Sequence, residues 1–237
     1  MPRPARIAFV RTPAAAPRVC HLVVRPGGFL RHLDWRKTRL WAQDAPCAIM
    51  SPMSALPQTR LDAEEFLTWS LGRPGRYELF GGVVVAQAAE RVAHAALKLE
   101  VCVALNDAIR GKGAACHALP DGVAVKIDAN TVYEPDAQVY CGPKLPGNAL
   151  LVENPVIVVE VLSPSTGRYD ETHKLAGYFS LASVQHFLIF DPDECLLVHH
   201  RRLDGEKLLT RILREGVVTL DPPGLEFDLA RLYAGQD

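Results

Sequence analysis

An ionisable glutamate lies inside an apolar run that has the pattern of a buried β-strand. The run is Pro155–Leu162, and Glu160 is its one charged residue. If the run is a strand, Val158, Glu160 and Leu162 share one face, and the residues between them share the other. Burying a carboxylate without a partner costs free energy, so a cation, a metal ion or a water-filled cleft must accompany it. This run therefore predicts both a buried strand and a polar site beside it.

A second acid, Asp136, stands in another strand-like segment, residues 132–140. Carboxylates on neighbouring strands offer the oxygen ligands that Mg²⁺ prefers, and such a site can activate water for phosphodiester hydrolysis. Lys174 could add a compact positive charge. Each residue also has a simpler interpretation. Glu160 would form an ion pair near the strand end, Asp136 would open a strand at its solvent edge, and Lys174 would form a surface pair on a helix.

Length and composition describe one ordinary folded domain. The chain has 237 residues, of which 49% are hydrophobic and 22% charged. No stretch approaches the roughly 18 uninterrupted apolar residues of a membrane helix, so we expect a cytoplasmic protein without membrane contact. The charge is uneven. Residues 1–52 hold nine Lys or Arg and two Asp, giving +7, whereas residues 53–237 hold 17 basic and 25 acidic residues, giving −8.

The basic, proline-rich segment over residues 1–52 has three interpretations. Its arginine-rich, acid-poor composition fits a targeting peptide, and its charge fits an arm that contacts nucleic acid. The third is an upstream extension before a start at Met50 or Met53, and we favour it because the composition changes sharply there. We therefore predict an extension over 1–52, disordered or a start-site artefact, and one domain over 53–237.

The six cysteines are widely spaced and contain no CxxC pair. In an intracellular chain this pattern predicts reduced, partly buried cysteines. A disulfide framework or a zinc ribbon is not expected.

Hydrophobic periodicity predicts a mixed α/β protein, an α+β sheet with helices on its faces. Helices are expected over residues 59–69, 90–109 and 169–181, with a short closing helix. On the longest of these, Val92, Ala96, Leu99 and Val103 fall on one stripe. Strands are expected over residues 76–80, 83–87, 114–119, 123–127, 132–140, 156–162, 184–190, 196–201 and 208–213.

Six motifs occur in a characteristic order: Tyr77–Gly82, His94, Pro135–Val139, Pro155–Thr166, Asp170–Tyr178 and His186–Pro192. Together they resemble the Uma family of endonucleases, of the restriction-endonuclease-like, PD-(D/E)xK superfamily, over about residues 57–233. The resemblance implies an αβββαβ core, preceded by a helix and hairpin and followed by a C-terminal hairpin. It also implies Asp136 and Glu160 as metal ligands and Lys174 as the catalytic cation.

Two positions depart from the family pattern. The superfamily signature places lysine two residues after the glutamate, where this chain has Leu162, so Lys174 would have to reach back from the following helix. Val83 stands where the family often has an acid after the hairpin glycine. Glu78 is then the candidate third acid, and its simpler interpretation is a solvated acid on a strand. His94, near the start of the long helix, is a candidate catalytic base or a hydrogen-bonded, partly buried histidine.

The sequence thus predicts a Mg²⁺- or Mn²⁺-dependent endonuclease that hydrolyses DNA, with RNA as the alternative substrate. The rival interpretation is a non-catalytic nuclease-fold binding or scaffold protein, which Leu162 favours. A hydrolase of small phosphate esters is a third. The charge of −8 argues mildly against strong nonspecific DNA binding. Because cutting two strands needs two sites, a homodimer is compatible with the predicted activity.

Overall fold

The computed structural model describes residues 56–57, 59–163, 168–204 and 207–234. The extension predicted over residues 1–52 lies outside the described residues. Within them, the strands form a four-stranded sheet, a six-stranded sheet and a two-stranded hairpin. None of the described helices is long and apolar enough to cross a membrane.

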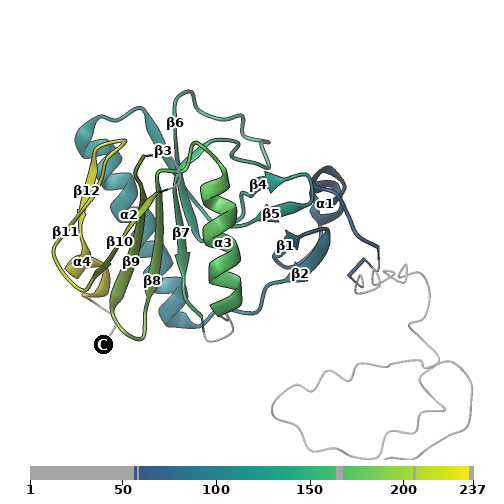
Figure 1. Ribbon diagram of the computed structural model, residues 1–237, viewed down its shortest axis with the longest axis horizontal. Helices are drawn as coiled ribbons and strands as arrows, with labels where there is room; N and C mark the ends of the chain where they lie inside the picture. The colour runs from purple at the N-terminus through teal and green to yellow at the C-terminus, as the bar shows by residue number, and fades with distance from the viewer. Residues whose placement is uncertain (1–55, 58, 164–167, 205–206, 235–237) are drawn as a thin grey trace, which may run out of the picture. The chain divides into compact units, whose positions relative to one another are not determined.

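The six-stranded sheet carries helices on both faces (Figure 1). Its order is β10 (Leu208–Leu213), β9 (Leu196–Arg202), β8 (His186–Asp191), β7 (Pro155–Val161), β6 (Ala137–Cys141) and β3 (Cys116–Pro120). β7 and β8 are parallel, because α3 (Arg168–Ser180) crosses between them, and the other pairs are antiparallel. α2 (Val92–Lys112) packs on the opposite face. The order α2-β3-β6-β7-α3-β8 is the predicted αβββαβ core of the restriction-endonuclease-like fold.

A smaller sheet lies beside this core and carries the N-terminal helix. Its order is β2 (Val83–Ala86), β1 (Tyr77–Phe80), β5 (Thr131–Tyr133) and β4 (Val125–Asp128). The hairpin between β1 and β2 turns at Gly81 and Gly82, both at positive φ, as the glycine pair predicted. α1 (Ala63–Ser70) begins at a capping box in which Asp62 and Glu65 each accept a backbone N–H of the other.

The segment over residues 132–140 is two strands rather than the single strand predicted. β5 ends at Tyr133 and β6 begins at Ala137, and the two strands belong to different sheets. Pro135 has no N–H to donate to a ladder, so pairing stops there and the chain passes from one sheet to the other. Asp136 therefore lies at the junction of the two sheets, not inside a strand.

The apolar stripe that indicated α2 faces solvent. Val92 is 87% exposed and Leu99 is 63% exposed. The helix instead packs on the core through a second apolar row: Leu97, Val101, Leu105 and Ile109. α2 is rich in alanine and carries apolar residues on more than one side, so their spacing predicts a helix but does not identify its buried face.

The C-terminal region contains a hairpin that the sequence analysis missed. β11 (Val217–Leu220) and β12 (Leu225–Asp228) pair after β10, and α4 (Leu229–Tyr233) closes the chain. Both strands are short, four residues each, which gives a weak period-two signal. Their inward residues complete the core around α2: Val218, Leu220, Leu225 and Phe227.

The prediction that all cysteines are reduced is wrong for one pair. Cys116 and Cys141 are joined by a disulfide between β3 and β6. They stand directly opposite each other in this antiparallel ladder, which the sequence separation of 25 residues does not reveal. Among the described cysteines, Cys102 and Cys195 are free.

Two buried histidines share a hydrogen bond on neighbouring strands. His186 Nδ1 lies 2.9 Å from His199 Nε2, and His186 Nε2 lies 2.9 Å from the carbonyl oxygen of Pro222. A carbonyl oxygen can only accept, so Nε2 of His186 donates and its Nδ1 accepts from His199. This arrangement uses neutral imidazoles, and burial lowers the pKa of each to about 4.

The histidine pair predicts a loss of stability in mild acid. The unfolded chain binds protons below about pH 6.5 that the folded protein does not bind until about pH 4, so folding weakens as the pH falls through this range. We expect a loss of roughly 2 kcal/mol per imidazole between pH 7 and pH 4.5, measured by urea unfolding at the two pH values. His199→Gln should flatten this dependence. Equal pH profiles for wild type and His199→Gln would contradict the assignment.

Candidate active site

Asp136 and Glu160 are held side by side where β6 and β7 meet. The Asp136 N–H donates to the Val159 carbonyl oxygen (3.0 Å), and the Val161 N–H donates to Asp136 Oδ2 (2.8 Å). Glu160 lies between these two β7 residues. Continuing the ladder in which Ala137 faces Val159 places Asp136 opposite Glu160. Both residues line one cleft with a volume of about 220 Å³.

Lys174 reaches back from α3 to the glutamate of β7. Its Nζ lies 3.0 Å from Glu160 Oε1 and 3.1 Å from Glu78 Oε1. Tyr178, one turn further along α3, donates its hydroxyl to Glu160 Oε1 at 2.7 Å. Leu162, at the position where the superfamily signature has lysine, packs against the apolar cluster under α3. The structure therefore supplies a cation at Glu160 from the helix instead of from the strand.

Glu78 joins this group from the second sheet. It lies on β1, is buried, and also accepts the Glu134 N–H at 2.9 Å. It is thus not the solvated strand residue of the simpler interpretation. It lies behind Lys174, whereas Lys174 and Glu160 line the cleft. Lys174 consequently ties the two sheets together as well as neutralising Glu160.

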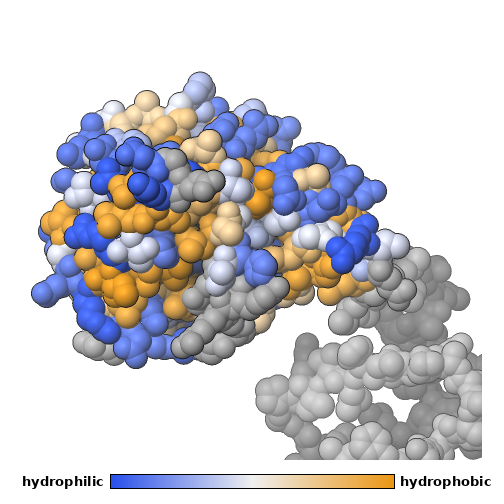
Figure 2. Space-filling view, viewed as in Figure 1, coloured by the Kyte–Doolittle hydropathy of each residue, from blue (hydrophilic) through white to orange (hydrophobic). Residues whose placement is uncertain are grey.

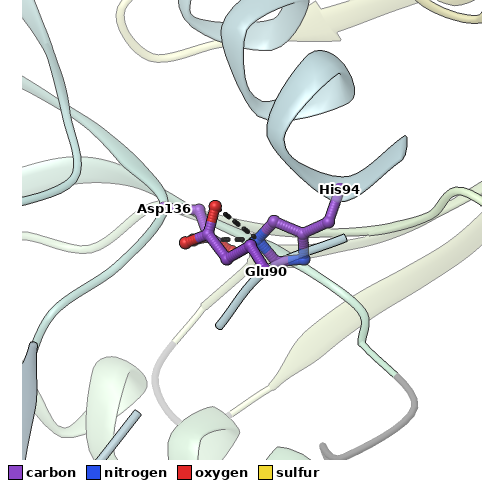
Figure 3. Close-up of side chains that lie close together, drawn as sticks. All are labelled: Glu90, His94 and Asp136. Atoms are coloured by element: carbon purple, nitrogen blue, oxygen red, sulfur yellow. Dashed lines mark hydrogen bonds and ion pairs between the residues drawn. The ribbon is translucent and has the colours of Figure 1, made fainter. Parts of the chain in front are cut away.

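His94 brings α2 to the other side of Asp136 (Figure 3). Its Nε2 lies 3.3 Å from Asp136 Oδ1 and 3.9 Å from Glu90 Oε2, and its Nδ1 is buried without a hydrogen bond. One ligand atom from each of these three residues lies within 4.8 Å of the others, so they form a group that could hold a metal ion. This group contains Asp136 of the predicted ligand pair and adds His94 and Glu90.

Sequence reasoning missed a ring of charges around this group. Arg76 pairs with Glu134 (2.8 Å) and Asp121 (3.0 Å) and also contacts Glu90. Lys98 pairs with Glu90 (2.6 Å) and Asp121 (2.9 Å). Lys98 follows His94 by one helical turn, so its position on the same side of α2 was readable from the sequence. Arg76 and Asp121 lie in separate connections, and nothing in their spacing indicated a shared site.

The hydrogen bond between His94 and Asp136 sets the charge of both. Burial alone would raise the pKa of Asp136, but the His94 hydrogen bond and the Val161 N–H outweigh it and hold the pKa below its ordinary value. Burial likewise opposes a charge on His94, and the same contact with Asp136 raises its pKa. Asp136 is therefore ionised at neutral pH, and His94 is biased towards the imidazolium.

Glu160 has the opposite tendency. Burial raises its pKa to about 8, although Lys174 and the Tyr178 hydroxyl partly offset this. The pKa of Tyr178 is itself raised well above its ordinary value by burial and by the Glu160 charge. Without a further cation, the carboxyl group of Glu160 thus favours its protonated form at neutral pH.

The linked charges leave this region with an excess of carboxylates. Three cations, Arg76, Lys98 and Lys174, form ion pairs with six acids: Glu78, Glu90, Asp121, Glu134, Asp136 and Glu160. The formal sum is three positive against six negative charges. Protonation of Glu160 and His94, which the metal-free site favours, reduces the excess to one negative charge, and a bound cation would release both protons. Oxygen ligands with an uncompensated negative charge are the donor set that divalent cations need. The residues present therefore fit a divalent metal ion.

Comparisons with known proteins show the family of the chain. A family model described as "Uma2: Putative restriction endonuclease" matches residues 63–233. The chain belongs to this family. The match begins with α1 and ends with α4, so it includes both sheets and every residue of the candidate site.

One relative matches most of this chain, and a second matches part of it. An uncharacterized protein of Synechocystis sp., slr1290, is 26% identical over 187 residues, which cover 78% of this chain and 96% of that protein. A second, sll1609, is 30% identical over 92 residues, 37% of this chain and 51% of that protein. A crystal structure from Anabaena variabilis, described as a "putative nuclease belonging to DUF820", superposes with a TM-score of 0.60 at 17% identity. It covers 75% of this chain and 99% of that one, and it supports the fold.

Proposed function

We propose that this protein is a Mg²⁺- or Mn²⁺-dependent endonuclease that hydrolyses phosphodiester bonds of DNA. Family membership supports a nuclease. The observation that carries the more specific proposal is the juxtaposition of Asp136 and Glu160 on one cleft, with Lys174 Nζ 3.0 Å from Glu160. The site thus contains two acids and a cation, although Leu162 stands where the superfamily signature has its lysine.

Asp136 is the central residue of the proposed metal site. It is shared by the predicted pair with Glu160 and by the group with Glu90 and His94. We assign Asp136 and Glu160 as ligands and Glu90 and His94 as further donors on the α2 side. When bound, the cation supplies Lewis-acid polarisation of a phosphate oxygen and a more acidic water.

The remaining residues position and neutralise. Tyr178 and Lys174 both contact Oε1 of Glu160 and so fix the carboxylate between α3 and the cleft. Lys174 also carries the positive charge that can stabilise charge developing on the phosphate oxygens during in-line attack. In the metal-free protein, His94 keeps Asp136 ionised and oriented through the 3.3 Å contact.

The proposal is tested by cleavage assays on the purified full-length chain. Supercoiled plasmid, single-stranded DNA, RNA and a small phosphate diester are incubated with Mg²⁺, with Mn²⁺, or with EDTA. We expect nicking and linearisation of the plasmid with either metal and none with EDTA. Asp193→Asn serves as the matched control for an aspartate-to-asparagine change, because Asp193 is exposed and pairs with Arg91 at the surface.

The outcomes separate the alternatives. Cleavage of RNA alone would replace DNA by RNA as the substrate. Turnover of the small diester without plasmid cleavage would indicate a small-ester hydrolase. Plasmid binding without cleavage of any substrate, under both metals, would contradict the catalytic proposal and favour the scaffold interpretation.

A further inference from the structure

β10 is an edge strand of the six-stranded sheet, and its outer edge is unpaired by any described strand. It pairs over its whole length with β9, Leu208 facing Arg202 and Leu213 facing Leu197. Its six residues contain no proline, no acid and one basic residue, Arg211. Such charge-poor edges present free backbone N–H and C=O groups to a further strand. Proteins that remain monomeric usually block such an edge with proline, charge or a bulge.

Two of the four exposed side chains of β10 are also large and apolar. Ile212 is 69% exposed and Leu209 is 42% exposed. Ile212 lies opposite Val198, which packs on the cluster under α3, so Ile212, Thr210 and Leu208 stand on the α3 side of the sheet. Figure 2 shows apolar surface on this side, over the strands next to α3. The edge therefore combines unused backbone pairing with uncovered side chains.

We propose that β10 pairs with β10 of a second copy of this chain, which joins the two sheets into one. A two-fold axis perpendicular to the sheet keeps each face continuous, so residues of one face must meet residues of the same face. An axis through Thr210 places Ile212 opposite Leu208 of the partner subunit and Thr210 opposite its own copy. Threonine pairs and apolar pairs across strands are both favourable.

The charge of Arg211 favours this register over the neighbouring register in which the axis passes through Arg211. An axis at Arg211 would place two arginines directly opposite each other, and like charges in that position destabilise a strand pair. With the axis at Thr210, Arg211 lies opposite Leu209 of the partner subunit, whose exposed side chain the aliphatic stem of arginine can cover. The five residues from Leu208 to Ile212 thus complement themselves, which favours a second copy over a foreign strand.

The proposal does not rest on nuclease activity, and its test needs none. The oligomeric state of the full-length chain is measured by sedimentation over the micromolar range. We expect a dimer, and Thr210→Lys, which sets two lysines opposite each other, should raise the dissociation constant at least tenfold. The matched control is Leu99→Lys, which charges the exposed stripe of α2 instead. A monomer at all concentrations, or a dimer that Leu99→Lys dissociates and Thr210→Lys does not, would overturn the proposal.

Oxidative crosslinking tests the register directly. A thiol introduced by Thr210→Cys meets its own copy at the axis and should crosslink rapidly. Arg211→Cys, one residue along the same strand, should not, because its neighbour across the axis is Leu209. The wild-type chain, with its exposed Cys195, sets the background. Crosslinking of Arg211→Cys but not of Thr210→Cys, or of neither, would contradict the proposed pairing.

Discussion

Asp136→Asn is expected to lower kcat for metal-dependent cleavage by about 10³-fold, because it removes the charge shared by both groups of proposed ligands. The asparagine side chain keeps the shape and can still accept the Val161 N–H. The fold, measured by circular dichroism and thermal unfolding, should therefore be retained. Asp193→Asn should retain wild-type rates. An Asp136→Asn enzyme with more than half of the wild-type kcat would remove Asp136 from the proposed catalytic site.

Metal binding by the same variants locates the ion. Mn²⁺ affinity is measured by calorimetry or by electron paramagnetic resonance on Asp136→Asn, Glu160→Gln and Glu90→Gln. All three are expected to weaken binding if the cation contacts both sides of Asp136. If Asp136→Asn and Glu160→Gln weaken Mn²⁺ binding and Glu90→Gln does not, the ion is bound by the predicted pair, Asp136 and Glu160. If Asp136→Asn and Glu90→Gln weaken binding and Glu160→Gln does not, the ion is bound by the group that contains His94.

Lys174→Met is expected to reduce both activity and stability. Its ammonium group is the shared partner of Glu78 and Glu160, and removing one member of a buried ion pair costs about 3–5 kcal/mol. We expect that loss in urea unfolding of the metal-free protein, together with a fall in kcat of about 10²-fold or more. Lys126→Met, which breaks an exposed pair with Glu64, should leave the stability close to that of the wild type.

A second substitution separates the two roles of Lys174. Adding Glu78→Gln to Lys174→Met removes one of the two carboxylates that the lysine neutralised, so part of the lost stability should return. Glu78 lies behind the lysine and away from the cleft, so cleavage should not return with it. Recovery of activity in the double variant would show that Lys174 acts through stability and not on the phosphate.

Local patterns predicted much of the fold because they report what each segment buries. The run around Glu160 is a central strand whose alternate residues contact opposite clusters, Val158 under α3 and Val159 under α2. Gly81 and Gly82 mark a real hairpin. The same kind of evidence failed on α2, where the apolar stripe at Val92 and Leu99 faces solvent. Periodicity measures the spacing of apolar residues, not what lies opposite them.

The sequence by itself determined which acid is placed in apolar surroundings. Glu160 sits in an apolar strand and needs a compensating charge wherever that strand lies, and family motifs pointed to Asp136 and Lys174 with it. Tertiary structure decided how the charge is compensated. The break at Pro135 sends β5 and β6 into different sheets, and this places Asp136 at their junction. The parallel connection from β7 to β8 lays α3 over Glu160, so that Nζ of a lysine 14 residues away lies 3.0 Å from its carboxylate. Such long-range pairing has no local signal, because it depends on the sheet order.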